Sequence, residues 1–238
     1  MVATVDRLPA PSASRRVGPR PGWAVERSLW REGLLRVAGV DEVGRGSLAG
    51  PVVAAAVVLP RTRSGVPCRA GWIRELDDSK ILTARQRERL AAVIRAECEW
   101  NLAAVSPQVI DQVNILQATR LAMRRAVAGL PARPAALIID GNEVAGSGLP
   151  ERSVVHADAR CVSVAAASII AKVARDAMME ELDQVFPGYG FAEHKGYATD
   201  VHRAAIARLG PTTVHRLSFA PVREAFFRVS GRAGRTTE

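Results

Sequence analysis

The chain has 238 residues, of which 48% are hydrophobic, and it carries a formal net charge of +9. This length predicts one domain, alone or with terminal appendages, and the hydrophobic content is ample for a core. The positive charge favours a polyanionic partner over an acidic surface or a small metabolite. No segment of the sequence is long and apolar enough to span a membrane. Aromatic residues make up only 5% of the chain, so contacts to a nucleic-acid backbone are expected to outweigh base stacking.

The two ends of the chain differ in composition from the middle. Residues 1–36 are rich in Pro, Ser and Arg and lack the apolar core of a signal peptide. We expect them to form a flexible basic tail with a short helix near residues 23–35, and we favour a solvated extension over an arm that grips DNA. Residues 37–230 are expected to form the folded domain and residues 231–238 a disordered tail. Three scattered cysteines fit neither a disulfide framework nor a zinc cluster, which favours the reducing cytoplasm.

The stretch 37–59, VAGVDEVGRGSLAGPVVAAAVVL, contains two short runs rich in Val and Ala, joined by a connection rich in glycine. This pattern predicts two buried, neighbouring antiparallel strands. Asp41 and Glu42 lie at the end of the first run, where an unpaired carboxylate would be costly to bury. A hard divalent cation is the expected partner of clustered carboxylates, and a purely structural hairpin turn is the alternative.

Adjacent residues of a regular strand point to opposite faces of the sheet. For Asp41 and Glu42 to share a cation, the strand must therefore twist or end at Glu42, or Glu42 must bind through its backbone carbonyl. The sequence leaves these alternatives open.

The remaining elements alternate between helices and strands, which predicts an α/β protein. Thr83 is expected to cap one helix, and Ser106 with Pro107 to begin another. Asn114 is expected either to cap a helix or to contact nucleic acid. The expected helices are 84–97, 107–130, 161–182 and 200–209, and the expected strands are 100–105, 134–140 and 152–155.

Two further carboxylates follow the same logic as the first pair. Asp140 ends an apolar strand and is followed by Gly141, and Asp158 lies at or before the first turn of an Ala-rich helix. An ordinary capping role is the alternative for Asp158, because a helix N-terminus favours a negative charge. Neighbouring strands of a mixed sheet are about 5 Å apart and can bring acids at their ends together.

Seven segments of the chain resemble the type 2 ribonucleases H, and specifically the bacterial ribonuclease HII family. They are DEVGRG with LAGPVVAAAVVL, LDDSK at 76–80, NILQAT at 114–119, LIIDG at 137–141, the run from Asp158 to Lys172, HKGY at 194–197 and PTTVHRLSFAPV at 211–222. The resemblance covers residues 37–222. It implies a ribonuclease H-like catalytic domain, in which a mixed β-sheet is flanked by helices and followed by additional C-terminal helices. Ile81, His156, Cys161 and Glu193 depart from the family pattern.

The resemblance also implies a site. Asp41, Glu42, Asp140 and Asp158 are expected to be catalytic and to bind two Mg²⁺ or Mn²⁺ ions. The Gly-Arg-Gly turn is expected to read the 2′-hydroxyl, and the tyrosine of HKGY to pack on the sugar at the RNA–DNA junction. The expected substrate-binding residues are Gly44, Arg45, Gly46, Lys80, Lys172, His194, Lys195 and Tyr197.

The implied activity is endonucleolytic hydrolysis of the RNA strand of RNA–DNA hybrids, and incision 5′ to single ribonucleotides embedded in duplex DNA. The products would carry 5′-phosphate and 3′-hydroxyl ends. The alternatives are ribonuclease HIII, which usually carries an N-terminal platform domain, and a non-catalytic hybrid-binding protein. We expect RNA–DNA hybrid and ribonucleotide-containing DNA as partners, no membrane, a monomer and a cytoplasmic location. A sliding-clamp contact stays open, since the C-terminal sequence has no clear clamp-binding peptide.

Overall fold

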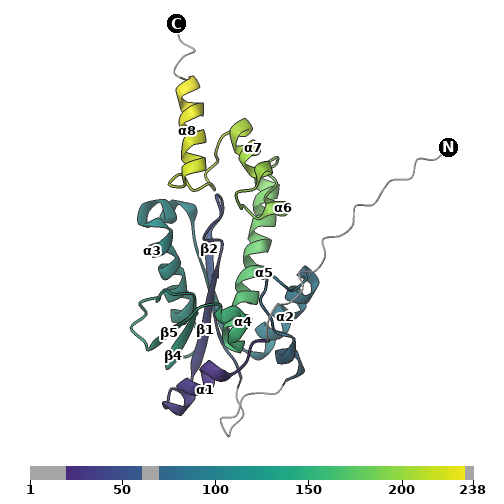
Figure 1. The fold of residues 1–238 in the computed structure, drawn as a ribbon. Coiled ribbons are helices and arrows are strands. Elements are labelled where there is room, and N and C mark those ends of the chain that lie inside the picture. The colour runs from purple at the N-terminus through teal and green to yellow at the C-terminus, as the bar shows by residue number, and fades with distance from the viewer. Residues whose placement is uncertain (1–19, 61–69, 234–238) are drawn as a thin grey trace, which may run out of the picture.

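The computed structural model describes residues 20–60 and 70–233. Its centre is a five-stranded mixed sheet with the strand order β3-β2-β1-β4-β5 (Figure 1). The strands are β1 (Val37–Val43), β2 (Val52–Val58), β3 (Glu99–Val105), β4 (Ala136–Asp140) and β5 (Glu151–Val154). The helices are α1 (Ala24–Arg31), the 3-10 helix η1 (Gly71–Glu75), α2 (Ala84–Glu97), α3 (Pro107–Ala128), α4 (Ala157–Arg160), α5 (Val162–Val185), α6 (Phe191–His194), α7 (Asp200–Leu209) and α8 (Ala220–Ala233).

The order of the strands confirms the predicted fold class. β1 pairs with β2 in antiparallel fashion, as the short connection predicts, and β2 pairs with β3 in the same way. On its other side β1 pairs with β4 in parallel, and β4 pairs with β5 in parallel. The central strand β1 therefore has a parallel neighbour whose C-terminal end lies at the same edge of the sheet.

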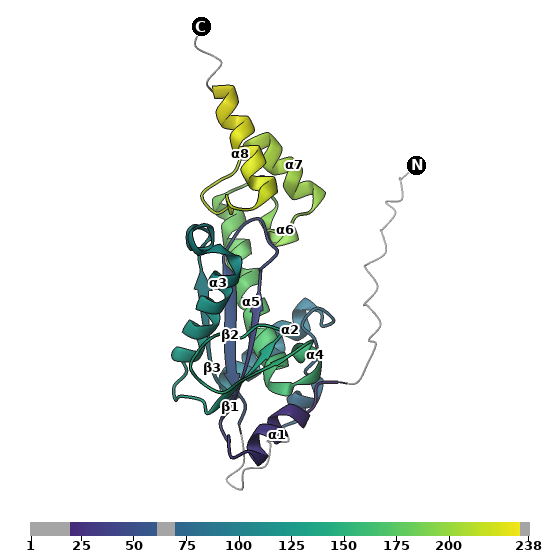
Figure 2. The ribbon, with the colours of Figure 1, turned by 60° about the vertical axis from the view of Figure 1, so that its left-hand side comes forward.

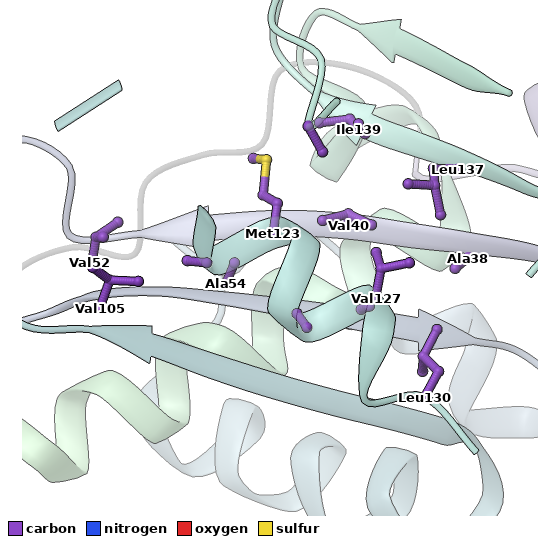
Figure 3. Packing of buried hydrophobic residues seen from close by; sticks show 14 of the residues in the cluster. Ala38, Val40, Val52, Ala54, Val105, Met123, Val127, Leu130, Leu137 and Ile139 are labelled. Carbon is purple, nitrogen blue, oxygen red and sulfur yellow. The ribbon is translucent and has the colours of Figure 1, made fainter. Parts of the chain in front are cut away.

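Helices cover both faces of this sheet. α3 packs on one face, and its Met123 and Val127 contact inward side chains such as Val40 and Ile139 (Figure 3). α2 and α5 pack on the opposite face (Figures 1 and 2). The run of small residues at the start of α5 lets that helix lie close to the strands, as its alanine content predicts.

The ends of the helices follow from their local sequences. Thr83 and Gln86 form a reciprocal capping box at α2, and the Ser106 side chain accepts a hydrogen bond from the Val109 N–H at the start of α3. α3 differs from the continuous helix we expected, because Asn114 interrupts it with a φ of 66°. The Asn114 side chain accepts a hydrogen bond from the Gln117 N–H and so caps the second part of the helix.

The segment that precedes β1 is more ordered than we expected. α1 lies within the range 1–36, yet its Glu26 and Leu29 are buried. Glu26 accepts hydrogen bonds from the backbone N–H and the hydroxyl of Ser163 in α5. Residues 20–36 are thus packed against the domain, whereas residues 1–19 lie outside the described residues, as do residues 234–238 of the predicted C-terminal tail.

Helices α6, α7 and α8 pack around a separate cluster at one end of the molecule (Figures 1 and 2). Leu48 and Ala49, from the connection between β1 and β2, belong to this cluster with Phe191. The connection is therefore held between the sheet and the C-terminal helices. Within the described residues, no helix is long and apolar enough to cross a membrane.

Candidate active site

The ends of β1 and β4 bring two carboxylates side by side. Val40 of β1 is the register partner of Ile139 of β4, so Asp41 and Asp140 are the next residues on two adjacent parallel strands. Glu42 does not end its strand, since β1 continues to Val43. A pocket of about 470 Å³ nevertheless contains both neighbours on β1, together with Asp140. It is lined by Asp41, Glu42, Val43, Ser79, Lys80, Asp140, Ser168, Lys172 and Tyr197.

The fourth acid, Asp158, comes from the short helix α4 and is buried. Its Oδ2 lies 3.5 Å from the Lys80 ammonium, and Lys80 also lines the pocket. The end of β4 is tied to α4, because the Ala157 N–H donates a hydrogen bond of 2.6 Å to Asp140 Oδ1. His156 precedes this helix in the left-handed conformation, with a φ of 55°, and is exposed.

The carboxylates of this group perturb one another. Burial raises the pKa of Asp41 well above its usual range, and the charges of Glu42, Asp140 and Asp158 raise it further. A hydrogen bond from Ser168 opposes this shift. Burial also raises the pKa of Glu42, although Arg45 opposes the shift, and burial raises that of Asp158. The raised pKa values result from several carboxylates that lie close together and are shielded from water.

A divalent cation fits the donor chemistry of this pocket. Carboxylate oxygens are the ligands that Mg²⁺ and Mn²⁺ prefer. The Oε2 atom of Glu42 is buried without a hydrogen-bond partner, so one oxygen ligand for a cation is already available. In the described part of the chain, no three His, Cys, Asp or Glu side chains are already arranged to hold an ion. Asp41 and Asp140 each accept a backbone N–H at Oδ1 only, and each carboxylate has a second oxygen with which to bind a cation.

Two buried arginines donate hydrogen bonds to carbonyls of the glycine-rich connection that follows β1. Arg175 donates hydrogen bonds to the carbonyls of Pro51, Ala49 and Lys195. Arg216 donates to the carbonyls of Gly50 and Arg45. Gly44 adopts a φ of +88°, and a Cβ there would lie 2.1 Å from Arg175 Nε. Only glycine fits this position.

The other predicted substrate-binding residues lie at different distances from the acids. Arg45 reaches Glu42 at 3.3 Å, and a Cβ added to Gly46 would meet no atom within 4 Å. Lys172 lines the pocket and forms an ion pair of 2.8 Å with Asp176.

The residues of the HKGY segment differ in whether they line the acid pocket. Tyr197 lines the acid pocket, whereas neither His194 nor Lys195 is among its lining residues. The His194 ring bonds to the Tyr189 carbonyl and the Gly196 N–H, and Lys195 forms an ion pair of 2.6 Å with Glu180.

Sequence reasoning missed several polar residues around the site. Arg175 and Arg216 are fully buried, and Ser168 bonds to the Ser79 hydroxyl at 2.9 Å as well as to Asp41.

Comparison with solved structures places the fold among nucleases. The ribonuclease H2 of Pyrococcus horikoshii superposes with a TM-score of 0.66 at 28% identity, covering 82% of this chain and 99% of that one. The ribonuclease HII in the PCNA complex from Archaeoglobus fulgidus gives a TM-score of 0.63 at 29% identity, covering 77% and 95%. Bst-RNase HIII in complex with Mn²⁺ gives 0.66 at 25% identity, covering 84% and 71%. Fold and site together define a nuclease of the ribonuclease H type.

Sequence comparison narrows this class to one family. The family model for ribonuclease HII matches residues 38–222. The ribonuclease HII of Paracoccus denitrificans is 50% identical over 204 residues, which cover 85% of this chain and 93% of that protein. The ribonuclease HII of Dehalococcoides mccartyi is 44% identical over 207 residues, covering 87% and 96%. The chain belongs to the ribonuclease HII family, and it is an endonuclease that hydrolyses the RNA strand of RNA–DNA hybrids.

Proposed function

We propose that this ribonuclease also incises duplex DNA 5′ to a single embedded ribonucleotide, leaving 5′-phosphate and 3′-hydroxyl ends. The observation that carries the proposal is a single pocket that contains three of the acids, Asp41, Glu42 and Asp140, together with Tyr197. Clustered carboxylates repel a phosphate, so a divalent cation must bind to them before the phosphate of the substrate can approach. The pocket also contains Lys80 and Lys172, whose positive charges suit a phosphate backbone.

Asp41, Glu42, Asp140 and Asp158 would hold two divalent ions, Mg²⁺ or Mn²⁺. When bound, such ions supply an activated water for in-line attack and neutralise the leaving oxygen. The support for this donor set is its carboxylate chemistry and the unpaired Oε2 atom of Glu42. Because its Oε2 atom is buried without a hydrogen-bond partner, Glu42 would bind through its side chain.

Selection of the ribonucleotide would fall to the turn and to Tyr197. Gly44, Arg45 and Gly46 are separated from Glu42 by Val43 alone, and the open space beside Gly46 admits a close approach by a sugar. The 2′-hydroxyl is the group that separates RNA from DNA at this position. Tyr197 lines the same pocket with 37% of its surface exposed, so its ring is available to pack on the sugar at the RNA–DNA junction. Lys80 and Lys172 would contact phosphates of the substrate. His194 and Lys195 would bind the nucleic-acid strand next to Tyr197.

The protein would act as a cytoplasmic monomer on hybrids and on ribonucleotide-containing DNA. Its net charge of +9 supports association with such polyanions without a partner protein. The Archaeoglobus fulgidus relative is described in a complex with PCNA, which makes a sliding clamp the first protein partner to test.

Replacement of Asp41 tests the proposal. We expect Asp41→Asn to lower cleavage of a duplex with one embedded ribonucleotide by about a thousandfold or more, because the central carboxylate is lost while the turn is kept. The assay resolves products on a gel, with Mg²⁺ and Mn²⁺ in parallel, and hybrid binding is measured by fluorescence anisotropy. Glu88→Gln, on the exposed face of α2, is the control.

Undiminished cutting by Asp41→Asn would contradict the assignment of the acids. Cleavage of long hybrids without any incision at a single ribonucleotide would contradict the proposed substrate while leaving the family activity intact.

A further inference from the structure

Three histidines gather in the C-terminal part of the domain. His194 ends α6, His202 lies in α7 and His215 precedes α8. The rings of His194 and His202 stack with centroids 4.4 Å apart, and those of His202 and His215 are 5.3 Å apart. His202 and His215 are buried, and neither has a part in the proposed chemistry.

The hydrogen-bond partners fix where the protons of this pair lie. The Thr212 N–H donates to His215 Nδ1 at 3.0 Å, so this nitrogen carries no proton and His215 Nε2 must carry it. His202 Nδ1 lies 2.9 Å from the Tyr197 carbonyl, which can only accept, so His202 Nδ1 carries the proton and its Nε2 is bare. The two Nε2 atoms are 3.2 Å apart, so His215 donates to His202.

The result is a one-directional chain from the Thr212 N–H through His215 and His202 to the Tyr197 carbonyl. An additional proton has no place in it. On His202 Nε2 the proton would face the His215 Nε2–H, and on His215 Nδ1 it would face the Thr212 N–H. Burial lowers the pKa of His202 to about 4 and that of His215 to about 3, so both rings are neutral at physiological pH.

The chain ends on the residue that faces the acids. The Tyr197 carbonyl also accepts from the Thr199 N–H, and the Tyr197 N–H donates to the His194 carbonyl at 3.0 Å. Its backbone is thereby fixed at both polar groups. The Tyr197 ring lies in the pocket, with the Arg175 guanidinium 5.6 Å from its centroid.

We propose that His202 and His215 are positioning residues that hold Tyr197 at the pocket and so determine the preference for an RNA–DNA junction. This inference rests on the proposed role of Tyr197 at the junction. Without this chain of hydrogen bonds, the segment around Tyr197 would keep its local turn but would lose the contact that connects it to residues 211–215. Small displacements of a substrate-positioning group reduce the rate steeply.

A matched pair of substitutions separates this role from simple packing. In His215→Gln the amide nitrogen takes the place of Nε2 and still donates to His202. In His215→Asn the amide oxygen takes the place of Nδ1 and still accepts from Thr212, but the side chain is too short to reach His202. Both variants remove the same ring from the core, so their packing losses are similar.

The readout is the ratio of kcat/KM for an embedded single ribonucleotide to kcat/KM for a uniform hybrid. We expect His215→Asn to lower this ratio about tenfold and His215→Gln to keep it within about twofold. Tyr197→Ala supplies the background for a double-mutant cycle, in which His215→Asn should produce no additional change in the ratio.

An unchanged ratio in His215→Asn, an equal loss in both variants, or an additional loss in the Tyr197→Ala background would overturn the proposal. Failure of the proposed function is recognised separately, because the wild-type protein itself would then show no incision at the embedded ribonucleotide. Thermal melts of each variant establish that the compared proteins are folded.

Discussion

Arg175 and Arg216 are two buried cations whose hydrogen bonds go to backbone carbonyls. Burial, followed by the charge of Arg175, lowers the pKa of Arg216 to about 9, which still leaves the guanidinium charged at neutral pH. The carbonyls that they bind belong mainly to the connection between β1 and β2. Arg216 therefore holds the Gly-Arg-Gly turn through the Arg45 carbonyl, and Arg175 holds the end of the same connection through the Ala49 and Pro51 carbonyls.

Arg216→Lys is expected to destabilise the fold although the charge is kept. The ammonium cannot reproduce the guanidinium contacts to both Gly50 and Arg45, and the carbonyls left without a donor cost about 1–3 kcal/mol of unfolding free energy. Urea unfolding measures this loss. Arg203→Lys on the exposed face of α7 is the control and should change the free energy by less than about 0.5 kcal/mol. Equal midpoints for both variants would refute the role of Arg216.

The residues of the site differ in how far the sequence predicts them. A strand that ends in an acid followed by glycine is a local pattern, which is why Asp41 and Asp140 stand out. Arg175 and His215 carry no such signal, because their partners lie far away in the chain and a buried arginine looks like a surface one in sequence. Whether Glu42 shares the pocket with Asp41 could not be decided from sequence, because adjacent residues of a regular strand point to opposite faces.

β1 lies directly against α5 at Gly39, where no side chain separates the two backbones. A Cβ added to Gly39 would lie 2.2 Å from the carbonyl carbon of Ser163 and 2.4 Å from the Val164 nitrogen. These are backbone atoms, so neither can turn away as a side chain would. Since β1 carries Asp41 and the segment before α5 carries Asp158, the closeness of this junction sets the separation of the two acids.

Gly39→Ala is therefore expected to destabilise the protein by about 3 kcal/mol and to lower metal affinity as α5 moves outward. Denaturant unfolding and a calorimetric Mn²⁺ titration measure the two effects. Gly71→Ala is the matched control, because a Cβ there meets no atom within 4 Å, and it should leave both quantities unchanged. A wild-type midpoint for Gly39→Ala would show that the junction can relax.

Most elements could be placed from sequence because they carry strong local signals at their ends. Thr83, Ser106 and Pro107 mark helix starts through side-chain and ring geometry that acts within one turn. A capping role for Asn114 was one of two alternatives and is the one observed, but the break in the helix was not predicted, since the apolar spacing continues through it. Burial of Glu26 was missed for a related reason: its partner, Ser163, is 137 residues away.

Acid is expected to weaken the molecule through the histidine pair. The pKa values of His202 and His215 in the folded protein, about 4 and about 3, lie below the ordinary value of 6.5. Between these values the two histidines bind protons in the unfolded chain but not in the folded protein. The free energy of unfolding is then unaffected above about pH 6.5 and falls as the pH drops towards 4, by up to about 1.4 kcal/mol per unit for each histidine.

Urea unfolding at a series of pH values measures this slope. His215→Asn should flatten the dependence between pH 6.5 and 4.5, whereas exposed His156→Asn should leave it as in the wild type. Identical slopes in all three proteins would contradict the role of the histidine pair in acid sensitivity.

The four acids come from β1, β4 and α4, and the Gly-Arg-Gly turn is held by Arg216, close to the C-terminus. A growing polypeptide that has left the ribosome only as far as β4 therefore contains neither Asp158 nor its turn-holding arginine. We therefore expect hydrolytic competence to arise only late in synthesis, so that an incomplete chain without these residues does not cut the nucleic acids around it.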